Sequence, residues 1–127
     1  MLGKTTIKAR TRIMTVAQHL DYDSLNALKE VMEGDFNFLV ETFLQDSADK
    51  MAQLKTLKPE LESDSIRRAA HSFKGSCSNL GAIRLASLCA TLEHKALAKD
   101  LADFADQTEE IDQEFTTVRN LLTNFLN

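Results

Sequence analysis

The fold of this chain is decided by residues 70–81, which read Ala-His-Ser-Phe-Lys-Gly-Ser-Cys-Ser-Asn-Leu-Gly. Apolar side chains in and just before this stretch recur three, four and seven positions apart, at Ile66, Ala69, Ala70, Phe73, Cys77 and Leu80. This spacing is typical of a helix that buries one face. At about 100° per residue, Phe73 lies near the middle of that face, and His71 points well away from it. We therefore expect His71 on an exposed helix face.

The exposed side of this helix has an unusual composition around His71. Lys74 and Gly75 follow it by three and four residues, so they share its side of the helix, as do Arg67 and Ser78. Glycine inside a helix costs about 0.5–1 kcal/mol relative to alanine, and a sequence that keeps one there usually has a packing or access reason. A cation beside an imidazole, next to a position with no side chain, predicts a site that accepts a phosphoryl group and lets a partner protein come close.

The same stretch resembles a known protein family. Ala-His-x-Phe-Lys-Gly-Ser at residues 70–76, then Asn-Leu-Gly-Ala at 79–82, is similar to the histidine-containing phosphotransfer (HPt) domain family, as are Leu85, Leu88, Cys89, Leu92 and Glu93. The similarity is dense from about residue 64 to 96 and continues, in pattern only, from 20 to 126. The resemblance implies a stand-alone phosphorelay carrier.

The resemblance also implies a role for each residue of the site. His71 would accept the phosphoryl group through Nε2, because a neutral imidazole is nucleophilic at cellular pH. Glu93 stands where the family commonly holds Gln or Glu, and it would orient the imidazole through the other nitrogen. Lys74 would offset negative charge on the phosphoryl oxygens. Partner contacts are expected at Gly75, Ser78, Arg67, Met32 and Phe38, the last two as an apolar docking patch.

The implied function is a shuttle between two receiver domains. A receiver aspartate on a hybrid sensor kinase would phosphorylate His71, which would pass the group to the aspartate of a response regulator. The sequence has no Gly-rich phosphate loop and no nucleotide-binding segment, so we expect no autonomous kinase activity. We also expect no metal site and no cofactor in this chain, with Mg²⁺ held by the partner receiver alone.

Length and charge restrict the function classes. A chain of 127 residues predicts one domain. Its net charge of −4 lacks the overall positive charge that is typical of proteins that bind nucleic acid or membranes. No apolar run approaches the roughly 18–20 residues of a membrane span, and no apolar segment follows the basic N-terminus as in a secretory signal. We expect a cytoplasmic monomer. Cys77 and Cys89 fall on apolar stripes and are interpreted as small buried hydrophobes.

Periodicity predicts an all-α fold. We expect helices over about 22–33, 36–57, 63–80, 82–98 and 103–126, packed as an antiparallel four-helix bundle with a short additional N-terminal helix. Gly34 would end the first and Asp35 would cap the second. A seven-residue repeat marks the last helix at Phe104, Ile111, Val118 and Phe125, beside a second row at Thr108, Phe115 and Leu122. Residues 1–19 are a basic tail or an extra helix, and 20–127 are the HPt domain.

Three other classes compete with this interpretation. A kinase dimerisation domain would build its bundle from two chains, and such sites usually have an acidic residue where Ser72 follows the histidine. A plain helical adaptor would carry an inert histidine. A di-iron bundle needs inward-facing Glu-x-x-His pairs, and the adjacent Glu93 and His94 have the wrong spacing. We interpret His94 as solvated, and His19 has no recognisable context.

Overall fold

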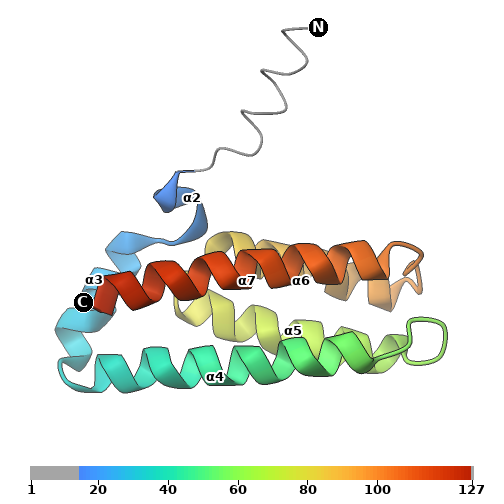
Figure 1. The fold of residues 1–127 in the computed structure, drawn as a ribbon, viewed down its shortest axis with the longest axis horizontal. Coiled ribbons are helices and arrows are strands. Elements are labelled where there is room, and N and C mark those ends of the chain that lie inside the picture. Colours follow the sequence, from blue (N-terminus) through green and yellow to red (C-terminus); the bar gives the residue numbers. More distant parts are fainter. Residues whose placement is uncertain (1–14, 127) are drawn as a thin grey trace, which may run out of the picture.

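The computed structural model describes residues 15–126, and this part of the chain is helical without a strand. Its elements, drawn in Figure 1, are α2 (Val16–His19), α3 (Tyr22–Met32), α4 (Asp35–Thr56), α5 (Ser63–Asn79), α6 (Ile83–Leu97) and α7 (Phe104–Leu126). The four long helices α4 to α7 run alternately in opposite directions along one axis (Figure 1). The predicted all-α, antiparallel four-helix bundle is confirmed, with short helices added before it.

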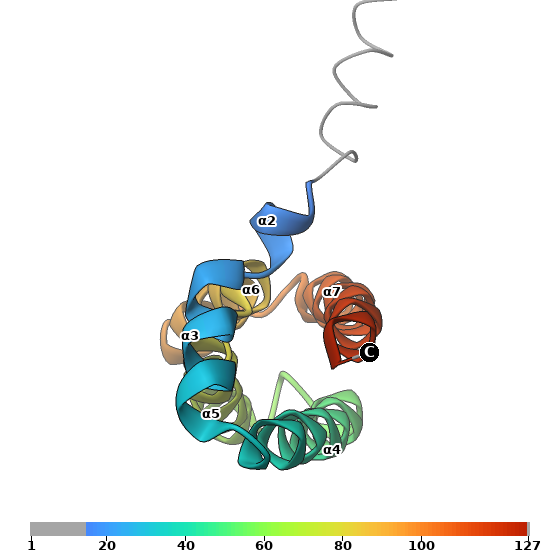
Figure 2. The same ribbon diagram turned by 90° about the vertical axis from the view of Figure 1, so that its left-hand side faces the viewer.

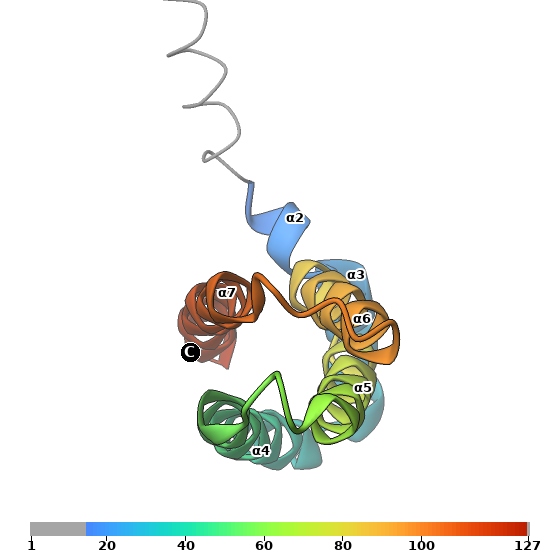
Figure 3. The same cartoon turned by 90° about the vertical axis from the view of Figure 1, so that its right-hand side faces the viewer.

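The bundle helices follow one another around a ring. Figures 2 and 3, which look along the bundle from its two ends, show α4, α5, α6 and α7 in that order, with α3 crossing one end. Short connections at 57–62, 80–82 and 98–103 join them, which favours packing of each helix against the next. A single chain thus supplies all four helices, whereas a kinase dimerisation domain takes them from two chains.

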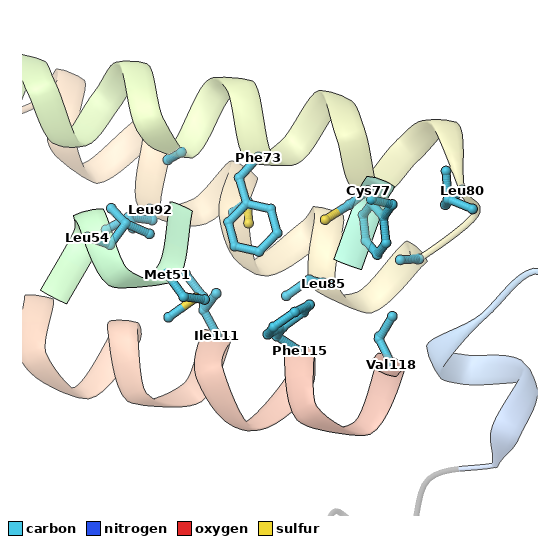
Figure 4. Close-up of a cluster of buried hydrophobic side chains, with 14 of the residues drawn as sticks. Met51, Leu54, Phe73, Cys77, Leu80, Leu85, Leu92, Ile111, Phe115 and Val118 are labelled. Carbon is cyan, nitrogen blue, oxygen red and sulfur yellow. The ribbon is translucent and has the colours of Figure 1, made fainter. Parts of the chain in front are cut away.

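The core lies inside this ring and sets the orientation of α5. Phe73 and Cys77 of α5 point inward toward Phe115 and Val118 of α7, as Figure 4 shows. The rings of Phe73 and Phe115 meet edge to face at 6.3 Å between centroids. Phe73 is fully buried, and burial of such a side chain contributes roughly 1.5–3 kcal/mol. Because Phe73 must face inward, the helix turns His71 outward.

The junction between α3 and α4 differs by one residue from the prediction. The positive φ angle of 50° that ends α3 belongs to Glu33, while Gly34 has φ −66°. Gly34 is the N-cap of α4, and Asp35, predicted to be that cap, is its first residue. A carboxylate in the first turn is still favourable, because it faces the positive end of the helix dipole.

The turn between α5 and α6 depends on Gly81. Its φ is +69°, a conformation that costs little for glycine and about 1–2 kcal/mol for other residues. The backbone N–H of Asp21 donates to the Gly81 carbonyl at 2.8 Å. A Cβ placed on Gly81 would lie 3.2 Å from Asp21 Cβ. The start of α3 is therefore packed directly against this turn.

A partly buried cluster of polar side chains attaches α2 to the bundle. His19 Nδ1 lies 2.6 Å from Glu114 Oε2, and Arg84 Nε lies 3.3 Å from Glu114 Oε1. Glu114 is 6% exposed, and the next residue along from His19, Leu20, is fully buried. His19 had no recognisable context in the sequence, yet here it joins α2 to α7. Of the predicted tail or extra helix at 1–19, residues 16–19 form α2, and residues 1–14 lie outside the described part.

Candidate functional site

His71 lies on the outer face of α5 and makes one polar contact with α6. Its side chain is 66% exposed, and Nδ1 lies 2.7 Å from Oε2 of Glu93, whose side chain is 18% exposed. The two residues come together because the tight turn at 80–82 lays α6 alongside α5. Leu92 is fully buried, so its neighbour Glu93 lies at the border of the core, where α6 meets the exposed face of α5.

The charge of Glu93 determines which nitrogen of His71 carries the proton. The Lys74 ammonium beside Glu93 holds the pKa of that carboxyl below its usual range; burial acts in the opposite direction, and the His71 hydrogen bond lowers it further. An ionised carboxylate can only accept hydrogen bonds, so Nδ1–H donates to it. In the neutral ring Nε2 then holds the free lone pair on the exposed side of the helix.

Lys74 contacts the same carboxylate as His71. Its Nζ lies 2.6 Å from Glu93 Oε1, while His71 takes Oε2. We predicted Lys74 as a partner for phosphoryl oxygens, and in this structure it is paired with Glu93 instead. One carboxylate therefore links the imidazole, through a hydrogen bond, and the ammonium, through an ion pair.

Gly75 leaves an open position beside His71. A Cβ built on this residue would meet no atom within 4 Å, so nothing inside the described part of the molecule requires glycine there. Ser78, one turn further on, is exposed and small. The surface next to the imidazole is thus low, and no packing contact within the described residues explains the glycine.

Arg67 is held by a carboxylate one turn earlier on α5. Asp64 Oδ1 lies 2.8 Å from Arg67 Nη2, and Asp64 Oδ2 accepts from Arg68, with its Nε at 2.9 Å. The hydrogen bonds from Arg67 and Arg68 lower the pKa of the Asp64 carboxyl. Asp64 bridges the two guanidinium groups, so part of the positive charge that we predicted near His71 is compensated.

The two predicted apolar docking residues differ in exposure. Phe38 is 72% exposed near the start of α4, whereas Met32, the last residue of α3, is half-buried and packs against the core. Val31, which the sequence analysis did not select, is 83% exposed. All three belong to α3 and α4, and none lies on the helices that hold His71 and Glu93.

A further feature beside His71 was not predicted from the sequence. A hollow of about 300 Å³ lies between α4 and α5, lined by Lys50, Gln53, Ser65, Arg68, Ala69 and Ser72. Lys50 directly precedes the buried Met51, so it borders the inward face of α4. The position of Lys50 beside a buried residue can be read from the sequence. Which helix Lys50 faces depends on how α4 packs against α5.

Residues 15–126 offer neither a cluster of metal ligands nor a helix suited to crossing a membrane. This part of the chain contains no group of three or more His, Cys, Asp or Glu side chains placed to hold a metal ion. None of its helices combines the length and the apolar character that crossing a membrane requires.

Comparison with known proteins places this site in a family context. The family model of the Hpt domain matches residues 39–121. Sensor protein TorS of Escherichia coli (strain K12) is 35% identical over 86 residues, which are 66% of this chain and 9% of TorS. The chain thus spans less than a tenth of that curated relative.

Two solved structures share the fold. Histidine-containing phosphotransfer protein B (HptB) of Pseudomonas aeruginosa PAO1 is 37% identical, with a TM-score of 0.82 over 85% of this chain and 94% of HptB. The maize histidine-containing phosphotransfer protein ZmHP2 is 20% identical, with a TM-score of 0.73 over 80% of this chain and 85% of ZmHP2, and shows the fold alone.

Proposed function

Because this chain belongs to the histidine-containing phosphotransfer (Hpt) domain family of phosphorelay proteins, we propose that His71 is its phospho-acceptor. The observation that carries the proposal is the hydrogen bond from His71 Nδ1 to Glu93 on an otherwise exposed ring. It leaves Nε2 free, on the side of the helix that a partner reaches. No other histidine in the described residues combines a fixed ring with this exposure, since His19 is half-buried and the ring of His94 makes no hydrogen bond.

The transfer step uses both nitrogens of the ring. The Nε2 lone pair attacks phosphorus on the aspartyl phosphate of a receiver, an N–P bond forms, and the bond from phosphorus to the aspartate oxygen breaks. The electron pair of that bond leaves with the aspartate carboxylate. The ring becomes cationic, and Glu93 stabilises it through Nδ1–H. Onward transfer is the reverse reaction with the aspartate of a second receiver.

Lys74 supports this step first through Glu93. Its ammonium keeps Glu93 ionised, and an ionised carboxylate stabilises the cationic ring better than a neutral one. A lysine side chain is a flexible chain of four carbons, so the Nζ of Lys74 can move from Glu93 to a phosphoryl oxygen once His71 is phosphorylated. We propose that Lys74 contacts the phosphoryl group in that second state.

Partners and metal follow from the same proposal. The donor would be the receiver of a hybrid sensor kinase and the acceptor a response regulator, with Mg²⁺ brought by the receiver. Gly75 and Ser78 would admit the partner's active surface, and Arg67 would add positive potential. Phe38, with the accessible part of Met32, would form the apolar contact. We further propose that the chain works as a cytoplasmic monomer without kinase activity of its own.

The test is phosphotransfer from a panel of radiolabelled phospho-receiver domains, read as acid-labile label on this chain. Wild type is compared with His71→Gln and with His94→Gln, a matched variant that removes an exposed histidine from α6. We expect rapid labelling of wild type and His94→Gln and none of His71→Gln. Circular dichroism should show that all three fold alike, because His71 makes no core contact.

Two results would contradict the proposal. Label that persists in His71→Gln would place the acceptor elsewhere. A folded wild type that takes no label from any receiver would favour the helical adaptor, in which the histidine is inert.

A further inference from the structure

The hollow between α4 and α5 borders the part of α5 that carries His71, although His71 itself does not line it. Of its lining residues, Ser72 follows His71 in the chain and Arg68 precedes it by one helical turn. Figure 3 shows α4 and α6 as the two neighbours of α5 in the ring of helices. Glu93 and Lys74 therefore occupy the α6 side of the imidazole, and the hollow occupies its α4 side.

The lining of this hollow is positive in a chain that is negative overall. Lys50 and Arg68 contribute two cations, of which Arg68 is paired with Asp64 outside the lining, and no carboxylate lines the hollow itself, although the chain carries a net charge of −4. The remaining polar groups are the Gln53 amide and the Ser65 and Ser72 hydroxyls, all of which can donate hydrogen bonds. Such a set of groups fits an anion.

Several of these donors have no partner within the described residues. No carboxylate between residues 15 and 126 lies within ion-pair distance of Lys50 Nζ. Arg68 uses Nε and Nη2 on Asp64, so its Nη1 donors remain available to an incoming group. In the same part of the chain the Ser65 and Ser72 hydroxyls make no hydrogen bond. The hollow therefore offers several unengaged donors beside the acceptor histidine.

We propose that Lys50 and Arg68 bind an acidic side chain on the receiver domain that docks over His71. This inference rests on the proposed function. A receiver that carries an aspartyl phosphate and holds Mg²⁺ needs carboxylates at its active surface, since Mg²⁺ is bound through carboxylates. Attraction between this surface and the hollow would align the partner on the α4 side of His71. Charged contacts of this kind mainly affect association and its salt dependence.

The experiment measures transfer from the receiver that labels wild type fastest, over a range of receiver concentrations and at low and high salt. The variants are Lys50→Gln, Arg68→Gln and the double variant. We expect KM to rise about 2- to 5-fold for each single variant, the effect of one exposed charge pair, with kcat little changed. The salt dependence of kcat/KM should become shallower, because fewer charge pairs remain to be screened.

Matched controls come from the opposite side of the same molecule. Lys55→Gln removes a lysine from α4 that pairs with Asp112 of α7, and Arg119→Gln removes an exposed arginine from α7. Both controls should keep the wild-type KM and salt dependence. If Lys50→Gln and Arg68→Gln behave like these controls, the proposal is wrong.

Two further measurements separate this proposal from its alternatives. Phosphoramidate, a small donor that needs no docking, should label His71 equally in all variants. Labelling by phosphoramidate, with no transfer to wild type from any receiver, would remove the proposed function and this inference with it. Titration with inorganic phosphate, followed by amide shifts at residues 50 and 68, tests for a small-anion site. If phosphate saturates these shifts while the Lys50 and Arg68 variants keep the wild-type KM for the receiver, the hollow binds a small anion and not an acidic side chain of the partner.

Discussion

At the scale of single residues, the site is a carboxylate shared by an imidazole and an ammonium. Glu93 accepts from His71 with one oxygen and pairs with Lys74 through the other, so each of these two groups affects how strongly the carboxylate holds the other. A neutral amide at this position can accept from Nδ1 but cannot pair with an ammonium. The glutamate therefore makes the orientation of His71 dependent on Lys74.

Lys74→Ala should raise the pKa of Glu93 toward its usual value, because it removes the largest cause that lowers it. The ¹³C shift of the Glu93 carboxyl, followed by NMR across an acid titration, measures this change. Lys95→Ala is the control, since Lys95 lies on the same helix as Glu93 but pairs with Asp103 at 2.8 Å. An unchanged titration of Glu93 in Lys74→Ala would show that the ion pair does not form in solution.

At the scale of elements, a glycine inside α5 and a glycine just after it have different effects. Gly75 sits inside α5 with open space where a Cβ would lie, and Gly81 closes the turn after α5 with a positive φ. The same substitution to alanine should therefore shift stability in opposite directions at these two positions.

Gly75→Ala should stabilise the protein by about 0.5–1 kcal/mol, the helix preference of alanine over glycine. Urea unfolding followed by circular dichroism measures the change. If Gly75 serves partner access, the same variant should also accept phosphate from a receiver more slowly, while phosphoramidate labels it as fast as wild type. A variant that is more stable and transfers at the wild-type rate would leave Gly75 without an access role.

Gly81→Ala should destabilise the protein by about 1–2 kcal/mol, because alanine is strained at positive φ. The new Cβ would also lie 3.2 Å from Asp21 Cβ and 3.3 Å from the Asp21 carbonyl oxygen, so the start of α3 would have to shift. The same urea measurement reports this loss. Stability equal to wild type would mean that the turn adopts another conformation.

At the scale of the whole molecule, ion pairs and hydrogen bonds to carboxylates at several places make stability dependent on acid. The carboxyl pKa is lowered at Asp21 by Ser24, at Asp64 by Arg67 and Arg68, at Glu93 by Lys74, and at Asp103 by Lys95. A group with a lowered pKa in the folded state stabilises the fold above its unfolded pKa. That contribution is lost as pH falls through the folded value.

These four groups should therefore leave the urea concentration at the unfolding midpoint unchanged from pH 7 to about 5. Below pH 4 their protonation should lower it. Removal of two partners in Lys74→Ala with Lys95→Ala should make the fall shallower, because less stabilisation remains to be lost. A midpoint that stays constant down to pH 3 would contradict the lowered values.

Local pattern was enough to predict the helices and the outward face of His71. The spacing of Phe73 and its apolar neighbours depends on the geometry of one helix, which is the same wherever that helix packs. Helix ends were predicted to within a residue or two, and the error at Asp35 arose because Glu33, not Gly34, adopts the positive φ. Glu114 also falls on the apolar stripe of α7 between Ile111 and Val118, and this position in the sequence already indicates a buried carboxylate that needs a partner.

The sequence by itself determined an all-helical bundle with an exposed histidine, a glycine beside it and a glutamate on the next helix as its expected partner. Only the tertiary structure decided that Lys74 pairs with this glutamate, that His19 pairs with Glu114, and that Lys50 and Arg68 share a hollow. The physical reason is distance along the chain. Periodicity is local, whereas these contacts depend on the rotation and register of whole helices, which the shared core sets.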